Sequence, residues 1–243
     1  MRFVPIKGVE QLEMQSLHRA RHLLVTQRTA LSNQIRGLLA EYGLVIPPGI
    51  HHLKRRLPDI LADESDELTT TLKPLFHELL GRFNAMSLQI REYDKQLDVF
   101  VKNNEVCQRL MAMEGMGSKT ASILVATVTD ASLFKNGREL AAWLGLVPRQ
   151  QSSGGKAYLQ GISKRGDRYI RTLLIHGARA ALTSWRRQKT PPTSPRARWA
   201  LSKLATLGHN KACVALANKM ARTAWVLLSS EVAYDKSFVS ATV

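Results

Sequence analysis

The pattern of hydrophobic positions predicts a long helix near the start of the chain, over residues 9–42. Four leucines recur there every seven residues, and no proline interrupts the stretch. An apolar seam of this width is typical of a helix that pairs with another helix. The leucines are Leu17, Leu24, Leu31 and Leu38, and Ile35 and Tyr42 fill in the seam.

A second long helix is predicted over residues 68–103, after a proline-containing break at residues 43–67. Its apolar side chains alternate at spacings of four and three, as in a coiled-coil seam. The two helices predict an antiparallel hairpin. Its uncovered apolar surface favours a homo-oligomer, most simply a dimer, and pairing within one chain is the alternative. The seam comprises Leu72, Phe76, Leu79, Phe83, Met86, Ile90, Tyr93, Leu97 and Phe100.

After residue 105 the predicted helices are shorter and are separated by turns. One helix ends near Met113, Gly115 and Gly117 form a tight turn, and Ser118 is expected to cap the next helix. This arrangement is similar to a helix-hairpin-helix motif, which directs backbone N–H groups at a DNA phosphate. Lys119 would add a positive charge there. A plain helix–turn–helix corner is the alternative interpretation.

The rest of the chain completes a mainly α fold with one short β-like hairpin. Gly145 is expected to end a short helix, and residues 146–166 form a central loop with the hairpin around 157–163. Residues 1–105 are interpreted as a coiled-coil linker or dimerisation region, and residues 106–243 as a compact helical domain. Further helices are predicted over residues 167–187, 197–207 and 210–229.

Charge distinguishes the two halves and indicates a polyanionic partner. The formal net charge is +16, yet residues 1–110 carry 15 Lys and Arg against 13 Asp and Glu. Residues 111–243 carry 20 against 6. This excess favours nucleic acid as the partner of the C-terminal half. A solvated basic face is the alternative.

The cysteines and the hydropathy pattern exclude several classes of protein. Cys107 and Cys213 lie in apolar contexts without metal-ligand spacing, which predicts two buried thiols and no metal site. No stretch is apolar enough to span a membrane, and the N-terminus lacks the pattern of a signal peptide. We therefore expect a cytoplasmic, nucleoid-associated protein without a membrane partner.

Candidate chemistry is concentrated in residues 145–171, which combine glycine, serine and six Lys or Arg residues. Glycine lets a backbone approach a phosphate, and cations neutralise it. The serines are either polar loop residues or a nucleophile, and no neighbouring side chain is an evident base. The cations are Arg149, Lys156, Lys164, Arg165, Arg168 and Arg171.

Several motifs in combination resemble the C-terminal part of the "one-ten" family of insertion-sequence transposases. These motifs are EGMGSKTAS, ELAAWLGLVPR, the Ser-Gly pair that follows, and SKRGD. The family includes relatives of the Piv DNA invertase and bridge-RNA-guided recombinases. The resemblance implies a transposase or site-specific recombinase that binds transposon-end and target DNA and a structured guide RNA. It also matches the long helical pair to the family's coiled-coil linker.

The resemblance further implies a serine that becomes covalently linked to a DNA phosphate. The family pattern maps that serine to Ser153, followed by Gly154, with Ser152 and Ser163 as alternatives. In the family, four acidic residues of an N-terminal ribonuclease-H-like domain bind a divalent metal such as magnesium. This chain begins where that domain should end, so no cofactor is expected in the chain itself.

The absence of those carboxylates leaves a second interpretation open. The chain could be a non-catalytic, nucleic-acid-binding and dimerising fragment of a decayed or split transposase, acting with an intact transposase. A helical RNA-binding protein unrelated to transposition is a third interpretation, and it predicts salt-sensitive RNA binding.

Overall fold

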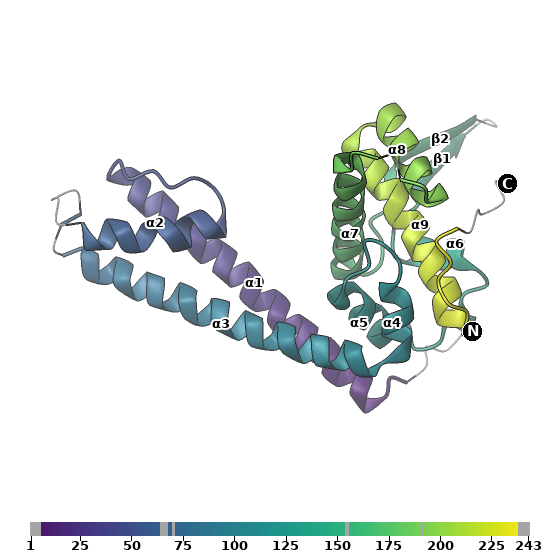
Figure 1. The fold of residues 1–243 in the computed structure, drawn as a ribbon, viewed down its shortest axis with the longest axis horizontal. Coiled ribbons are helices and arrows are strands. Elements are labelled where there is room, and N and C mark those ends of the chain that lie inside the picture. Colours follow the sequence, from purple (N-terminus) through teal and green to yellow (C-terminus); the bar gives the residue numbers. More distant parts are fainter. Residues whose placement is uncertain (1–5, 64–67, 70, 154–155, 191, 238–243) are drawn as a thin grey trace. The chain divides into compact units, whose positions relative to one another are not determined.

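A computed structural model describes residues 6–63, 68–69, 71–153, 156–190 and 192–237, without the side chains at positions 152, 153, 156 and 157. The described residues form nine α-helices, one short 3-10 helix and one two-stranded antiparallel sheet (Figure 1). The predicted mainly α class is therefore confirmed. The chain divides into an N-terminal unit, residues 16–96, and a C-terminal unit that joins the first 15 residues to residues 97–243. The sequence instead suggested a single boundary near residue 105.

The N-terminal unit consists of most of α1 (Val9–Glu41), the whole of α2 (Ile50–Ala62) and most of α3 (Lys73–Asn103). Its apolar core takes side chains from all three helices. Arg21 of α1 also forms an ion pair with Asp94 of α3, with Nε 2.5 Å from Oδ1. The fully buried core side chains are Ile35, Leu39, Leu53, Leu57, Phe76 and Phe83.

Helix α2 corrects the prediction that residues 43–67 contain only a break. The helix has Pro58 in its interior, and proline removes one backbone hydrogen bond at a cost of about 3 kcal/mol. Leu53, Leu57 and Leu61 follow one helical face and are buried. Burying each leucine contributes about 1.5–3 kcal/mol, so packing outweighs the proline.

The predicted seam of α3 is confirmed, whereas that of α1 is displaced by one residue. In α3, five seam positions are buried: Phe76, Leu79, Phe83, Ile90 and Leu97. In α1 the predicted Ile35 is buried, whereas the four predicted leucines are only half-buried and Tyr42 is exposed. The other buried positions include Gln15, His18, Ser32 and Leu39. Three polar residues of α1, Gln15, His18 and Ser32, occupy buried positions that a search for apolar spacing overlooks.

The C-terminal unit is built around α9 (His209–Ser229), which packs against helices from several parts of the sequence. Buried alanines along α9, at positions 212, 217, 221 and 224, let the neighbouring helices approach closely. The neighbours are α4 (Glu105–Met111), α6 (Gly137–Trp143), α7 (Arg168–Arg187) and α8 (Pro195–Leu207).

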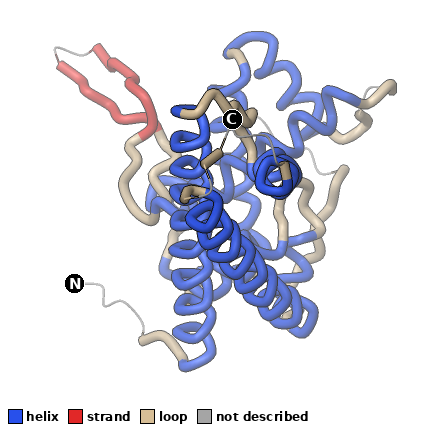
Figure 2. Tube along the Cα trace, turned by 90° about the vertical axis from the view of Figure 1, so that its left-hand side faces the viewer, coloured by secondary structure: helices blue, strands red, loops and turns tan. Residues whose placement is uncertain are grey.

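Two further elements complete this unit. Helix α5 (Ser118–Thr127) packs against α4 and α7, and η1 (Ala131–Leu133) contacts α9. Strands β1 (Pro148–Ser153) and β2 (Lys156–Ile162) form a hairpin that extends away from the helices (Figure 2). Close packing of the helices thus leaves one exposed β ribbon on this unit.

Candidate nucleic-acid interface

The β hairpin rises from a base where two glycines allow backbones to touch. Gly145 has a φ of +71°, and a Cβ atom there would lie 2.1 Å from the carbonyl oxygen of Arg165. Gly166 has a φ of +76°, and its Cβ would lie 1.9 Å from the carbonyl oxygen of Trp143. Only glycine fits at either position. Leu144 is the C-cap of α6, and Gly145 is the residue after it, so the predicted glycine ends the helix one position beyond the cap. The N–H of Leu146 closes this helix end by donating to the carbonyl of Ala141 at 3.0 Å.

A buried arginine fixes this base to α7. Arg171 is 7% exposed, and its Nη1 donates to the carbonyl oxygens of Leu144 at 3.1 Å and Arg165 at 2.9 Å. From α9, Asn218 donates Nδ2 to the carbonyl of Leu146 at 3.1 Å. Arg171 was predicted to bind nucleic acid. Its guanidinium is buried and donates to two carbonyl oxygens of the protein, so the prediction that it contacts nucleic acid has no exposed group to support it.

The strand register places the predicted nucleophile at the end of β1, beyond a register shift between Pro148 and Gln150. Ser152 pairs with Ala157 and Ser153 with Lys156 across the antiparallel ribbon. The hairpin is longer than the predicted one, since β1 already begins at Pro148. Gly154 lies outside the described residues, as do the side chains of Ser152, Ser153 and Lys156.

Ser163, the third candidate nucleophile, follows β2 at the base of the hairpin. Its backbone N–H donates to the carbonyl of Val147 at 2.8 Å. Its Oγ is shielded from solvent and has no hydrogen-bond partner among the described residues. This burial argues against Ser163 as a group that meets a DNA phosphate.

Four of the predicted cations are exposed on or beside the hairpin. Arg149 belongs to β1, Lys164 and Arg165 follow β2, and Arg168 begins α7. Lys164 has a φ of +56°, which places it in the left-handed turn that leads towards α7. Exposed cations of this density attract a polyanion and can each contact one phosphate.

The ribbon also presents uncharged side chains to solvent. Tyr158 and Leu159 are 61% and 71% exposed. On the neighbouring strand, Gln151 accepts a hydrogen bond from Gln160 at 2.9 Å. An aromatic ring beside amide groups can stack on bases and hydrogen-bond their edges, in addition to the contacts that the cations make with phosphates.

The predicted tight turn between α4 and α5 is present, but its first glycine serves packing. Gly115 has a φ of +88°, and a Cβ atom there would lie 2.7 Å from the carbonyl oxygen of Gly177 in α7. A Cβ at Gly177 would lie 2.0 Å from the carbonyl oxygen of Gly115. The two backbones touch, so the glycine at position 115 is required for packing on α7, and its predicted phosphate contact stays a prediction.

The start of α5 differs from the prediction in one detail. Gly117 is the N-cap and Ser118 is the first helical residue, so the expected side-chain cap by Ser118 is wrong. The amides of Thr120 and Ala121 both donate to the Gly117 carbonyl at 3.0 Å. Gly117 is exposed, and Ser118 and Lys119 are half-buried beside it. These three residues remain candidates for a phosphate contact.

A buried arginine of α8 also contacts the same turn. Nη2 of Arg196 donates at 2.7 Å to both the carbonyl and the Oε2 of Glu114. The guanidinium carbon lies 5.7 Å from the ring centroid of Trp185 and 5.4 Å from that of Tyr234. Burial lowers the pKa of Arg196, and Tyr234 and Glu114 oppose that shift. The α4–α5 turn is therefore tied to α8 as well as to α7.

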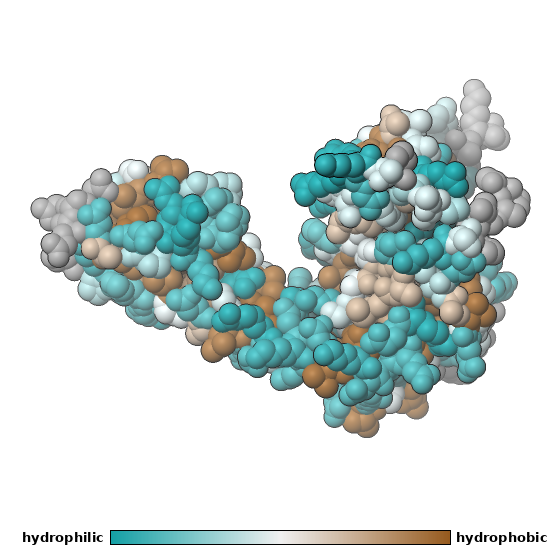
Figure 3. All heavy atoms as spheres, viewed as in Figure 1, coloured by the Kyte–Doolittle hydropathy of each residue, from teal (hydrophilic) through white to brown (hydrophobic). Residues whose placement is uncertain are grey.

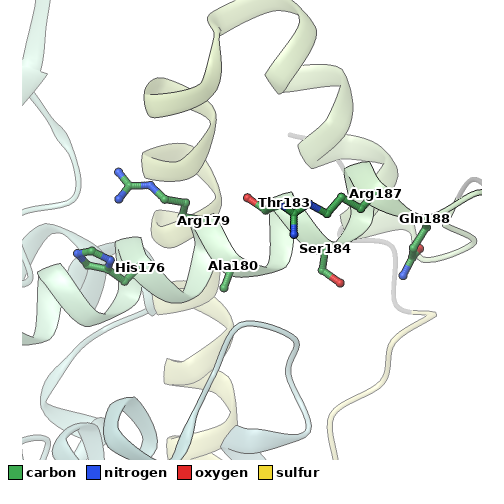
Figure 4. Close-up of a pocket in the computed structure, with 7 residues that line it drawn as sticks. All are labelled: His176, Arg179, Ala180, Thr183, Ser184, Arg187 and Gln188. Atoms are coloured by element: carbon green, nitrogen blue, oxygen red, sulfur yellow. The ribbon is translucent and has the colours of Figure 1, made fainter. Parts of the chain in front are cut away.

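Helix α7 also lines an open groove of 540 Å³ that the sequence did not predict. Its lining residues recur along one face of the helix, and none is acidic (Figure 4). Hydrophilic side chains gather over the end of α7 that leads towards α8 (Figure 3). The available signal was the absence of Asp and Glu from residues 168–230. The lining is His176, Arg179, Ala180, Thr183, Ser184, Arg187 and Gln188.

The resemblance implies a magnesium site on the family's N-terminal domain and none on the residues described for this chain. No group of three or more His, Cys, Asp or Glu side chains in the described ranges could hold a metal ion. Both cysteines are free and buried. Among the helices that the structure describes, none is long and apolar enough to cross a membrane.

Comparison with known proteins gives one consistent family. The family model described as "Transposase IS116/IS110/IS902 family" matches residues 107–194, a range that includes the α4–α5 turn, the hairpin and α7. A "Probable family 20 transposase" of Pseudomonas aeruginosa is 44% identical over 96% of this chain and 68% of its own length. The transposase for insertion sequence element IS1111A of Coxiella burnetii is 46% identical over 96% of this chain and 63% of its length.

A more distant relative agrees. The transposase for element IS1328 of Yersinia enterocolitica is 36% identical over 97% of this chain and 69% of its length. The chain thus spans about two thirds of the length of these relatives. On this similarity, the chain belongs to the IS116/IS110/IS902 family of transposases.

Proposed function

We propose that this chain acts in transposition by binding the DNA ends of an insertion sequence and by linking Ser153 covalently to a DNA phosphate. The observation that carries the proposal is the hairpin itself. Position 153 ends β1, on a ribbon whose base is fixed by Gly145, Gly166 and Arg171. Family membership supports transposition as the process.

The proposed step is a transesterification. The Oγ of Ser153 attacks the phosphorus of a backbone phosphodiester, an Oγ–P bond forms and one P–O bond of the DNA breaks. The hydroxyl proton ends on the leaving oxygen, so no oxidant or reductant is needed. Cations near the phosphate offset the charge on its oxygens during the transfer. Arg149, Lys164, Arg165 and Arg168 are exposed around the hairpin and can supply them.

Position matters as much as charge in such a step. The reaction is faster when the nucleophile is already held in line with the reacting phosphate. The entropy cost of bringing the two groups together is then no longer part of the activation barrier. The contacts of Arg171 with Leu144 and Arg165 join the two chain segments that enter and leave the hairpin. We infer that Arg171 aligns the hairpin with the phosphate without touching the DNA.

The sequence near Ser153 offers no evident base, so we infer that groups supplied by another domain or chain activate the hydroxyl. The family resemblance implies metal-binding carboxylates on a ribonuclease-H-like domain, and it implies a guide RNA that selects the sites. The exposed leucines Leu23 of α1 and Leu88 of α3 offer apolar surface for self-association. A homo-oligomer, a guide RNA and carboxylates supplied by another chain or domain are accordingly parts of this proposal.

The proposal is tested by covalent trapping. The chain is incubated with labelled duplex DNA of an insertion-sequence end, guide RNA and magnesium. The Pseudomonas relative is also added, in a variant whose serine at the position matching Ser153 is replaced. Any adduct at this serine must then form on the chain under test. We expect a denaturation-resistant adduct whose peptide contains Ser153. Ser153→Ala should remove the adduct and leave DNA binding unchanged, and Ser163→Ala should retain both.

Two results would overturn parts of the proposal. An adduct that persists in Ser153→Ala but disappears in Ser152→Ala would move the nucleophile by one residue. Binding without any adduct in the unaltered chain would favour the alternative, a nucleic-acid-binding fragment without chemistry of its own.

A further inference from the structure

We infer that the groove on α7 is a second binding site for the sugar–phosphate backbone of a nucleic acid, separate from the hairpin. The inference rests on the proposed nucleic-acid function but does not need a serine nucleophile. It assigns a role to a surface that the serine chemistry leaves unused.

The lining of the groove has the composition of a phosphate site. Arg179 and Arg187 provide guanidinium groups, and Thr183 and Ser184 provide hydroxyl donors between them. Arginine suits phosphate because its planar fork can donate two hydrogen bonds to one phosphate group. Figure 4 shows His176 and Arg179 towards one end of this row and Arg187 and Gln188 at the other. Every polar side chain in the row can donate a hydrogen bond.

The helical spacing gives the groove the length of a backbone segment. Residues 176–188 follow about three turns of α7 and its first following residue. At about 1.5 Å per residue, Arg179 and Arg187 stand about 12 Å apart along the axis. Successive phosphates of one duplex strand advance by about 3.4 Å along the helix axis. The two arginines can therefore contact different phosphates of one strand.

The two arginines differ in exposure. Arg179 is half-buried near Cys213 of α9, and its positive charge opposes the rise that burial causes in the Cys213 pKa. Arg187, by contrast, is exposed at the end of α7. One half-buried cation and one exposed cation can together contact a backbone of variable shape.

Electrostatics favour the same occupant over a protein partner. Residues 168–230 form α7, α8, α9 and their connections, and they contain twelve Lys and Arg but no Asp or Glu. No acidic side chain therefore competes with a phosphate for the groove from this part of the chain. Uniform positive charge of this kind attracts nucleic acid without regard to its sequence.

The test measures the salt dependence of binding in the full chain. The probes are a mixed-sequence 20-base-pair DNA duplex and an RNA duplex of the same sequence. We compare Arg187→Gln with Arg138→Gln, which removes the same charge from an exposed position of α6 outside the groove. Arg187→Gln should weaken binding about tenfold and reduce the slope of log K against log salt by about 0.9. Arg138→Gln should leave the slope unchanged.

A second measurement locates the contact directly. Phenylglyoxal modifies accessible arginines, and peptide mass spectrometry reports each site. Bound nucleic acid should protect Arg187 but not Arg138. Equal slopes for the two variants, or no protection of Arg187, would overturn the inference. A larger effect with the RNA duplex would identify RNA as the occupant, and a larger effect with the DNA duplex would identify DNA.

The two proposals fail in different ways. If no covalent adduct forms but Arg187→Gln lowers the salt slope, the groove proposal stands and the serine proposal is refuted. If an adduct forms at Ser153 but Arg187→Gln leaves the salt slope unchanged, the serine proposal stands and the groove proposal is refuted.

Discussion

Replacing Gly177 by alanine tests whether the α4–α5 turn depends on direct backbone contact with α7. In an exposed helix interior, Gly→Ala stabilises the fold by about 0.5–1 kcal/mol. At position 177 the new Cβ would lie 2.0 Å from the carbonyl oxygen of Gly115, which is a backbone atom. An ordinary contact begins at 3.4 Å, so the turn and α7 would have to separate by about 1.4 Å.

The magnitude follows from these opposing effects. Overpacking a tightly packed contact costs about 1–3 kcal/mol. Met220 also packs at this contact, with its Cε 3.6 Å from the new Cβ, so separating the turn from α7 would loosen that packing as well. After the gain in helix propensity, we expect Gly177→Ala to destabilise the C-terminal unit by about 2 kcal/mol. At a typical urea dependence of about 2 kcal/mol per molar, the unfolding midpoint should fall by about 1 M.

Tryptophan fluorescence is the appropriate assay because all four tryptophans lie in the C-terminal unit. The matched control is Gly37→Ala, an exposed position in α1 with nothing within 4 Å of the added atom. The control should leave the fluorescence transition in place and stabilise the N-terminal unit, as measured by circular dichroism. A midpoint for Gly177→Ala at or above that of the unaltered chain would refute the contact.

Three further predictions use the same urea assay. Arg171→Met should cost about 2–3 kcal/mol because it leaves the carbonyls of Leu144 and Arg165 unpaired, whereas the exposed Arg168→Gln should cost less than about 0.5 kcal/mol. Arg196→Gln should cost about 2 kcal/mol through loss of its bonds to Glu114, and the exposed Arg198→Gln again serves as its control. Burial, with a smaller effect of Glu10, raises the pKa of the Cys107 thiol from 9.0 to about 12 in the folded chain. The contribution of the neutral thiol to folding stability is therefore fully present below about pH 9, the pKa of the thiol in the unfolded chain. That contribution should be lost at up to about 1.4 kcal/mol per pH unit as the pH rises towards 12, and Cys107→Ala should flatten the decline; an unchanged slope in Cys107→Ala would contradict the assignment.

Much of the architecture could be predicted because it depends on local patterns. The four-and-three spacing of α3 specifies its buried face, and Gly145 and Asp167 mark a helix end and a helix start as sequence signals suggest. Helix α2 was missed because Pro58 argues locally against a helix that tertiary burial nevertheless stabilises. Local signals carry no information about that burial.

The candidate site shows where sequence reasoning loses its basis. The serines and exposed arginines could be identified from composition, but Arg171 and Arg168 look alike in sequence and lie in opposite environments. Gly115 meets Gly177 across 62 residues, a contact that no local motif encodes. The groove on α7 likewise required knowledge of which helical face remains open to solvent.

The twelve positive charges of residues 168–230, with no acidic residue among them, repel one another in the folded state. A bound polyanion relieves that repulsion, and ligand at about one hundred times its dissociation constant adds about 2.7 kcal/mol of folding stability. We therefore expect the nucleic-acid-free protein to unfold, and to be degraded by proteases, sooner than the bound protein. Charge imbalance in these helices would thus limit the lifetime of every copy that has lost its nucleic acid.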